Sequence, residues 1–245
     1  MRVIWGVFFK KWVQCLSCVL EECNFYFETG GLRISSLSSC QTSCIEAWIP
    51  KESFEYYEIG VPTTLGVSLT VLTSLLKLKS TSQQVVWDLN NEDICTMHFI
   101  ENNQTHVTFT ISMMYLEADM LQIPDHIVYD ACVTVEQQKM KYWYQVIQQV
   151  KGACEFHIQH NGLTLVSKND HTDIQLFNHD VPCVLISEPF QCSIGFKAFE
   201  NAFQCSQIAD HMKIQIKADN PIGFQVEFGT GASMTLYVAP LMTDD

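Results

Sequence analysis

The feature that most constrains the fold of this chain is a fourfold recurrence of one helix and several short strands. Apolar residues spaced three and four positions apart predict amphipathic helices over residues 7–20, 67–79, 137–151 and 194–205. The helix starts are separated by about 60, 70 and 57 residues, which is close to a regular period. Such a period indicates one architectural unit that the chain uses repeatedly.

Short segments of alternating apolar and polar residues separate the helices and predict β-strands. The turn Glu28-Thr29-Gly30-Gly31 joins strands expected at 23–27 and 32–37, and Asn161-Gly162 turns a second hairpin. One helix with several antiparallel strands, used four times, gives an α+β chain with helices on one face of antiparallel sheets. Residues 2–9 predict a first strand that runs into the first helix. Further strands are expected at 44–49, 54–60, 85–89, 95–100, 107–113, 155–159, 163–166, 174–177, 184–188, 212–216, 224–228 and 234–238.

The segment at 114–125 interrupts the repeat near the middle of the chain. It has no clear period, carries acidic residues and contains Pro124, which together favour a linker. A chain of 245 residues is long enough for two domains of about 120 residues each. We therefore expect an N-terminal domain at 1–113 and a C-terminal domain at 126–245, joined by this linker.

Eleven cysteines give no pattern for a metal site or a disulfide framework. Cys15 and Cys18 fall inside a predicted helix rather than at its start, where a redox-active pair belongs. Cys40 and Cys44 have no second pair of Cys or His residues at zinc-ligand spacing nearby. We expect buried, reduced thiols that pack as small apolar residues, no metal, no cofactor, and a cytosolic or nuclear compartment. No stretch approaches the length of a membrane span.

The charge of the chain is strongly uneven. With 27 acids against 14 Lys and Arg residues, the net charge of −13 argues against nucleic-acid binding when the chain is taken as a whole. The four helix windows hold eight of those 14 basic residues but a single acid, Glu200, where random placement would put about six. The basic residues in these windows are Lys10, Lys11, Lys77, Lys79, Lys139, Lys141, Lys151 and Lys197.

Two interpretations explain the near-absence of acids from the helices. The plain one is a set of solvated faces that carry Lys because Lys is a good helix former, although such faces usually mix Glu with Lys. The functional one is a surface that faces phosphates. Lys offers flexible point charges, and the windows contain no Arg for paired contacts with guanine edges. The pattern therefore favours contact with double-stranded DNA that does not read its sequence.

Several short motifs follow one another in an order and spacing that resemble a known family. Leu65-Gly66-Val67-Ser68-Leu69 opens the second helix, and Leu121-Gln122-Ile123-Pro124 is similar to a Leu-Gly-Ile-Pro linker sequence. Asn161-Gly162, Ala218-Asp219-Asn220-Pro221 and the tail Leu236-Tyr237-Val238-Ala239-Pro240 match as well. Over nearly the whole chain, these motifs resemble the proliferating cell nuclear antigen (PCNA) family of DNA sliding clamps.

The resemblance implies a clamp fold without catalytic residues, in which two-domain subunits close head to tail into a homotrimer around duplex DNA. Such a ring is a processivity factor for DNA polymerase in the nucleus, or at a cytoplasmic replication site in a viral member. The subunit contact would join the strand around 106–111 to one around 173–177 of a neighbour. The interface residues that the resemblance implies are His106, Val107, Phe109, Ile111, Ile174 and Leu176.

The resemblance also implies a hydrophobic pocket beneath the linker. In the family this pocket takes the short PIP-box peptides of replication and repair proteins, and a clamp loader is a further expected partner. The pocket residues carried over from the family are Leu37, Gln41, Thr42, Cys44, Leu121, Ile123, Pro124, Pro221, Tyr237, Ala239 and Pro240. Plain core packing is the alternative for the apolar members of this set.

The sequence departs from the family on the DNA-facing helices. Several basic family positions are neutral here, namely Ser17, Ser74, Tyr142, Gln145 and Gln204, while Lys10, Lys11, Lys77 and Lys197 are kept. Two other functions stay open. One is a related clamp that scaffolds repair or checkpoint proteins in a hetero-ring or as a monomer. The other is a Cys–His hydrolase, for which the spacing supplies no nucleophile signature.

Overall fold

The computed structural model describes residues 2–80, 82–89, 94–102, 104–117, 127–159, 162–178, 182–185, 189–217 and 220–241. These residues form two compact units. The first unit comprises the described residues within 1–39, 45–121 and 228–234, and the second comprises those within 40–44, 122–227 and 235–245. Of the linker expected at 114–125, only 114–117 lie within the described residues.

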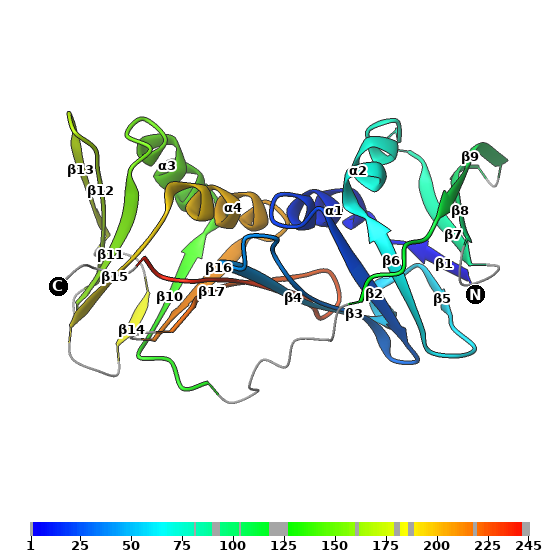
Figure 1. The fold of residues 1–245 in the computed structure, drawn as a ribbon, viewed down its shortest axis with the longest axis horizontal. Helices are drawn as coiled ribbons and strands as arrows, with labels where there is room; N and C mark the ends of the chain where they lie inside the picture. The colour runs from blue at the N-terminus through cyan, green and yellow to red at the C-terminus, as the bar shows by residue number, and fades with distance from the viewer. Residues whose placement is uncertain are drawn as a thin grey trace. The chain divides into compact units, whose positions relative to one another are not determined.

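The first unit packs two helices, α1 (Phe9–Ser17) and α2 (Leu69–Lys77), on one side of its strands (Figure 1). Its described strands form an antiparallel sheet in the order β5-β1-β7-β8-β9 and a second set in the order β4-β3-β2-β6. Their bounds are β1 (Arg2–Trp5), β2 (Glu22–Glu28), β3 (Gly31–Leu37), β4 (Ser43–Pro50), β5 (Tyr56–Glu58), β6 (Thr63–Ser68), β7 (Gln84–Leu89), β8 (Ile94–Glu101) and β9 (Gln104–Ser112).

The core of the first unit is a cluster of aromatic rings from its helices and strands. Trp5 stacks on Phe9 with ring centroids 3.8 Å apart, and Trp87 meets Trp5 edge to face at 5.2 Å. Trp12 and Phe25 complete the cluster, and all five side chains are buried. Large aromatic rings remove much apolar area from water, so this cluster fixes α1 to the sheet. The apolar stripe predicted for the first helix is therefore confirmed as its buried face.

The second unit repeats this plan with α3 (Gln137–Ile147) and α4 (Phe196–Ser206), which lie side by side (Figure 1). One antiparallel sheet has the order β13-β12-β11-β15, and the other strands follow the order β14-β10-β16-β17-β18. Their bounds are β10 (Ala131–Glu136), β11 (Ala153–Gln159), β12 (Gly162–Lys168), β13 (Asp173–Asn178), β14 (Cys183–Leu185), β15 (Phe190–Ile194), β16 (His211–Ile216), β17 (Ile222–Phe228) and β18 (Ala232–Val238). The expected α+β class, with helices on antiparallel sheets, is confirmed.

Two contacts hold α3 in place within the second unit. Tyr144 stacks on Phe203 of α4 with ring centroids 4.1 Å apart. On the buried side, the indole N–H of Trp143 donates a 3.0 Å hydrogen bond to Oδ1 of Asn178 at the end of β13. A buried indole N–H is costly without a partner, so this bond ties α3 to the sheet.

Three strands that directly precede helices are absent from the sequence prediction, namely β6, β10 and β15. Each strand runs into its helix with at most one residue between them. At the start of α2, for example, Ser68 ends β6, and its hydroxyl accepts a 3.4 Å hydrogen bond from the Val71 N–H. The apolar alternation of the strand merges with the apolar stripe of the helix, so periodicity alone does not show the boundary.

Three of the four predicted helix windows, those of α1, α2 and α3, are also too long at their carboxyl ends. α2 ends at Lys77 and α3 ends at Ile147, so Lys79 and Lys151 follow these helices rather than belong to them. The strand predicted at 54–60 is wrong for most of its length, because only β5 pairs there, after the short 3-10 helix η1 (Lys51–Ser53). Helix ends commonly fray into turns that carry no periodic signal.

Most of the cysteines serve as small apolar residues of the core. None of the ten whose side chains are described forms a disulfide, and six of them are buried. Burial raises the pKa of Cys154 and Cys192 to about 12. Burial, assisted by the Asp88 carboxylate, raises the pKa of Cys95 to about 12 as well. Thiols of this kind hold little thiolate at neutral pH and react slowly.

We expect these thiols to make the chain less stable in alkali. Unfolded thiols ionise near pH 9, whereas Cys95, Cys154 and Cys192 ionise near pH 12 in the folded chain. Their contribution is therefore complete below pH 9 and is lost as the pH rises from 9 to about 12, by up to about 1.4 kcal/mol per thiol per pH unit. Urea unfolding at about pH 7.5 and about pH 10.5 measures the loss, which should be smaller in Cys154→Ala. Equal stability at both pH values would contradict this expectation.

Candidate functional site

Lysines are concentrated at the starts of the helices. Lys10 and Lys11 lie in the first turn of α1, Lys139 in that of α3 and Lys197 in that of α4. None of the four helices that the structure describes has an acid in its first turn. A helix start carries the positive end of the helix dipole, where an acid is stabilising and a lysine is not. The arrangement becomes favourable when an anion lies in front of these helices.

The first unit brings two lysines from different elements close together. Lys79 follows α2, and its Nζ donates a 3.0 Å hydrogen bond to the Ser80 carbonyl. Partial burial and the nearby charge of Lys10 lower the pKa of Lys79, and the Glu55 carboxylate opposes that shift. Lys10 and Lys79 line one recess of about 530 Å³. The positive charge of this unit therefore gathers between the start of α1 and the end of α2.

Glu200, the single acid in the predicted helix windows, offsets the positive charge of α4. Its carboxylate accepts hydrogen bonds from Lys197 Nζ at 2.8 Å and from the Tyr144 hydroxyl at 2.9 Å. These two bonds, with the charge of Lys151, hold the pKa of Glu200 below its usual range. Lys197 is thus an ion-paired lysine, and its charge is less available to a phosphate than the charge of an unpaired lysine would be.

Glu200→Gln should strengthen binding of duplex DNA, because it releases Lys197 from its ion pair. One additional phosphate contact would steepen the dependence of log affinity on log salt by about 0.9. Fluorescence anisotropy with a labelled duplex over a range of salt concentrations measures that slope. Glu52→Gln, in the exposed η1 turn, makes the same charge change away from the helices and serves as the control. The same slope in both variants would show that Lys197 does not face DNA.

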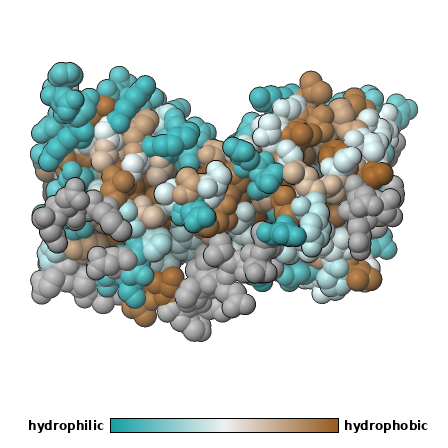
Figure 2. All heavy atoms as spheres, in the orientation of Figure 1, coloured by the Kyte–Doolittle hydropathy of each residue, from teal (hydrophilic) through white to brown (hydrophobic). Residues whose placement is uncertain are grey.

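The outer surface of α2 is more apolar than the sequence pattern indicates. Val71 and Leu78 are exposed there, and Leu78 is 69% exposed. Figure 2 shows brown and tan patches over α2. The basic residue of this helix, Lys77, lies in its last turn, where the negative end of the helix dipole stabilises it. The amino-terminal part of α2 therefore contributes no positive charge.

β9 forms an edge of its sheet in the first unit, beside β8. Phe109 packs edge to face on the buried Phe99 at 5.3 Å, and Val107 and Ile111 lie on the same side of the strand. His106 lies on the other side, with its Nε2 3.9 Å from the Glu101 carboxylate. The strand has nine residues and no Asp, Glu, Lys or Arg. It therefore offers an uncharged edge that another strand could extend.

β13 forms an edge of its sheet in the second unit, beside β12. Ile174 and Leu176 are half-buried on the side of the strand that packs against α3. Phe177, on the opposite side, is 63% exposed. The structure thus places all six residues expected at a subunit interface on two edge strands, with β9 in the first unit and β13 in the second.

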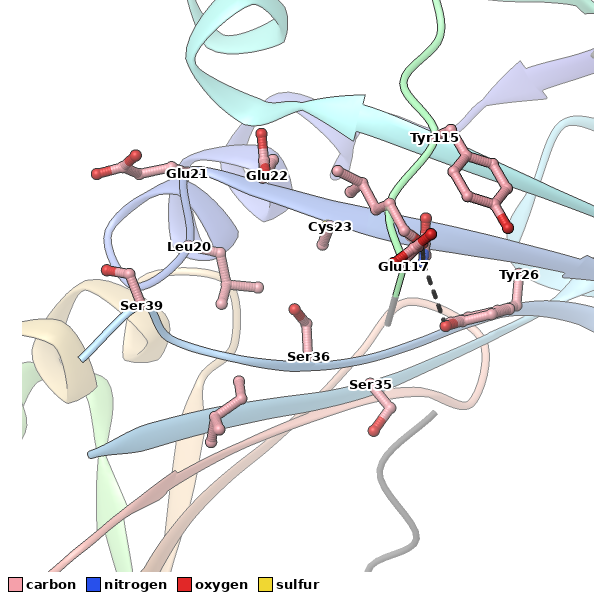
Figure 3. Close-up of a pocket in the computed structure, with 13 residues that line it drawn as sticks. Leu20, Glu21, Glu22, Cys23, Tyr26, Ser35, Ser36, Ser39, Tyr115 and Glu117 are labelled. Carbon is pink, nitrogen blue, oxygen red and sulfur yellow. Dashed lines mark hydrogen bonds between the residues drawn. The ribbon is translucent and has the colours of Figure 1, made fainter. Parts of the chain in front are cut away.

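An acidic recess of about 630 Å³ lies in the first unit among β2, β3 and the chain at 115–117. Figure 3 shows three carboxylates around it, those of Glu21, Glu22 and Glu117. Leu37, which is 42% exposed, is the one residue of the expected peptide pocket that lines it. The sequence pattern does not predict this group, because Glu117 lies far from the two other glutamates along the chain. The recess combines negative charge with an exposed aliphatic side chain.

The other residues expected in the peptide pocket lie elsewhere. Leu121, Ile123 and Pro124 are outside the described residues. In the second unit, the Ala239 N–H donates a 2.9 Å hydrogen bond to the Thr42 carbonyl, which holds the chain after β18 beside residues 40–44. The remaining expected residues of this unit are Gln41, Cys44, Pro221, Tyr237 and Pro240.

Two α+β units, each with two helices on antiparallel sheets, define the DNA-clamp class of protein. Within the described residues, no three or more His, Cys, Asp or Glu side chains are grouped so as to hold a metal ion. In that same part of the chain, every helix is too short or too polar to cross a membrane.

Comparisons with known proteins agree with that class. The family model for the N-terminal domain of proliferating cell nuclear antigen matches residues 1–122. The proliferating cell nuclear antigen of Chaetomium thermophilum is 21% identical, over 96% of this chain and 95% of its own. The DNA polymerase sliding clamp of Methanococcus vannielii is 21% identical, over 95% and 94%. The crystal structure of the antigen from Entamoeba histolytica has a TM-score of 0.89 at 19% identity and covers 98% of both chains. The chain belongs to the PCNA family of sliding clamps.

Proposed function

We propose that this chain assembles into a ring that encircles duplex DNA and acts as a processivity factor for a DNA polymerase. The observation that carries the proposal is the set of lysines in the first turns of α1, α3 and α4, with no acid in those turns. Flexible lysines attract phosphates without fixing a sequence register, which suits a protein that slides. The relative from Methanococcus vannielii is named a DNA polymerase sliding clamp.

The proposed ring is a homotrimer in which β9 of one subunit pairs with β13 of the next. A contact between two different surfaces closes into a ring when the rotation between subunits fits. Pairing would cover both sheet edges and bring the apolar side of β9, with Phe109, against that of β13, with Leu176. Each subunit would consist of domains at 1–113 and 126–245 joined by the linker at 114–125.

Replication and repair proteins would dock on this ring through PIP-box peptides, and a clamp loader would place it on DNA. The expected docking residues are the eleven carried over from the family. The acidic recess beside Leu37 supports a peptide that has basic residues next to its hydrophobic anchor, because charge complementarity steers such a peptide. The polymerase would be kept on DNA by topological linkage, so the role needs no catalytic residue or cofactor. The compartment that fits this role is the nucleus, or a cytoplasmic replication site for a viral chain.

Primer extension on a circular single-stranded template tests the proposed role. With polymerase and clamp loader present, addition of the protein should lengthen the products made in one binding event. The gain should disappear on a linear template with free ends, because a ring slides off. Product lengths that do not change when the protein is added would rule out a processivity factor.

A second candidate is a clamp-like scaffold that works in a hetero-ring or as a monomer. The ion pair between Lys197 and Glu200 favours it, because it weakens the attraction of the second unit for DNA. Light scattering separates the two functions. A species near three times the 28.0 kDa chain mass supports the homotrimer, and a single-chain mass supports the scaffold.

A further inference from the structure

β9 is an edge strand that is exposed over most of its length. Seven of its nine residues are exposed, and it pairs with β8 at the end of the sheet. Phe99 of β8 lies opposite Val107. The next residue, Ile100, lies opposite Thr105, which leaves His106 as the extra residue of a β-bulge. A bulge interrupts the ladder of hydrogen bonds, and an exposed edge strand opens at low free-energy cost. The part of β9 beyond the bulge therefore needs another anchor.

A chain of polar side chains anchors β9 across the sheet. Thr108 lies directly opposite His98 of β8, and its Oγ1 is 2.9 Å from Nδ1 of the imidazole, within hydrogen-bond distance. The other ring nitrogen, Nε2, lies 3.4 Å from the Asp88 carboxylate of β7. The second oxygen of that carboxylate lies 3.6 Å from Arg2 Nε of β1. These contacts link four adjacent strands, β9, β8, β7 and β1 (Figure 1).

His98 stands on the outer face of β8 and uses both of its ring nitrogens. Phe99, its neighbour in sequence, is buried in the core, so the imidazole lies on the opposite face. The side chains of His98 and Asp88 are 22% and 27% exposed, and partly buried groups are screened less by salt than exposed ones. A hydroxyl both donates and accepts, so the contact with Thr108 persists in either protonation state of the imidazole. The tie between β8 and β9 therefore does not depend on the charge of His98.

A hydroxyl, an imidazole and a carboxylate in this order also form the catalytic set of some hydrolases. Such an enzyme needs donors, often backbone N–H groups, aimed at the oxygen that becomes negative during attack. Side chains stand perpendicular to a sheet, whereas strand amides point in its plane toward neighbouring strands. The amides of β8 and β9 therefore do not reach an oxyanion formed above Thr108. The arrangement suits a structural tie rather than acyl transfer.

We infer that His98 is a positioning residue, which holds β9 beyond its bulge as a preformed edge for a strand of a second copy of this chain. A strand that is already ordered loses less conformational entropy when it pairs, so it binds more tightly. Six residues of β9 lie beyond the bulge, at 107–112, and β13 also has six. The ordering of β9 is a property of the single chain. Its effect on assembly rests on the ring proposed above.

Hydrogen exchange of single chains tests whether His98 orders β9. The comparison is made in full-length Leu176→Asp, because a ring would itself protect this strand. Adding His98→Ala should make the β9 amides exchange about fivefold faster, since one hydrogen bond is lost, and should leave those of β1 near their parent rate. His98→Asn keeps a polar atom at the place of Nδ1 and should restore slow exchange. His157→Ala removes a histidine from β11, an interior strand of the other unit, and should leave β9 unaffected.

The pattern of exchange along the sheet distinguishes a local tie from general stability. Unchanged β9 exchange in His98→Ala would overturn the inference. Equal acceleration in β9, β7 and β1 would overturn it as well, because that result would show a loss of stability throughout the sheet.

The strength of the ring tests the effect on assembly. Thr108→Val keeps the branched shape of the side chain and removes its hydroxyl. Thr108→Val and His98→Ala should each weaken assembly about fivefold per subunit contact, and the double variant should weaken it no further, because both remove the same bond. Light scattering over a dilution series measures these changes. Additive losses, about 25-fold in the double variant, would contradict the inference.

The two measurements separate this inference from the proposed function. If β9 exchange responds to His98→Ala but the parent is a single chain at every concentration, the positioning of β9 stands and the ring is refuted. If the parent forms a ring and β9 exchange does not respond, the ring stands and the inference is refuted. A ring of parent strength in His98→Ala also refutes the inference.

Discussion

Replacing Lys10, Lys11, Lys77 and Lys197 with alanine should leave ring assembly intact and strongly reduce loading on DNA. Each lysine that contacts a phosphate releases counterions, so the loss of four contacts should lower the slope of log affinity against log salt by about three to four. Duplex affinity at low salt should fall at least about a hundredfold. The contribution of Lys197 should be the smallest of the four, because Glu200 already pairs with it at 2.8 Å. Anisotropy titrations give the slope, and primer extension gives the processivity.

The chain supplies a matched control for this variant. Four lysines lie outside the predicted helix windows and make the same change in net charge when replaced by alanine, namely Lys51, Lys168, Lys213 and Lys217. Their loss should leave the salt slope close to that of the parent, because long-range attraction alone is largely screened at physiological salt. An equal loss of DNA affinity in the two quadruple variants would show that net charge matters and that the positions of the lysines on the helices do not.

Leu176→Asp should separate the ring into single chains. The substitution places a charge on the half-buried apolar side of β13, where a neighbouring strand would have to remove it from water. Light scattering should show a fall from near three times 28.0 kDa to near 28.0 kDa, and the gain in product length on circular templates should be lost. Gln175→Asp changes the adjacent residue, which is exposed on the other side of the strand, and should weaken assembly much less.

A mixing experiment separates a damaged interface from a damaged fold. Val107→Asp alters β9, the other half of the proposed contact, and should also yield single chains. Each variant retains one intact surface, so a mixture of the two should form a dimer through intact β9 and intact β13. Circular dichroism and thermal unfolding check that each variant is folded. Single chains in the mixture, from two folded variants, would contradict a head-to-tail contact between these strands.

Local periodicity was sufficient to predict the helices and most of the strands. Phe9 and Trp12 sit three positions apart on one face of α1, and both are buried, since an amphipathic helix must cover its apolar stripe. The same reasoning fails where β6 meets α2, because Leu65 and Val67 of the strand and Leu69 of the helix are all buried and form one continuous apolar signal. The boundary is set by the capping bond from Val71 to Ser68, which no periodicity reveals.

The candidate site also has one part that the sequence predicts and one part that only the structure shows. The near-absence of acids from the helices is a property of composition along the chain, and it predicts without any structure which lysines we propose to face DNA. Whether each of those lysines is ion-paired depends on residues that lie far away in the sequence. Tyr144 and Glu200 are 56 residues apart in sequence, yet their hydrogen bond helps to decide that Lys197 is paired. Lys79 meets Lys10 only because α1 and α2 pack together.

The amino-acid sequence by itself therefore determined the α+β class, the fourfold repeat, the family and the sign of the charge on the helices. These properties depend on periodicity and composition, which act over one or two turns of chain. Only the tertiary structure decided which lysines are neutralised, where a recess gathers positive charge, and which strands are left as sheet edges. Electrostatic interactions and solvent exposure depend on distance through space, and packing brings together residues that no local pattern connects.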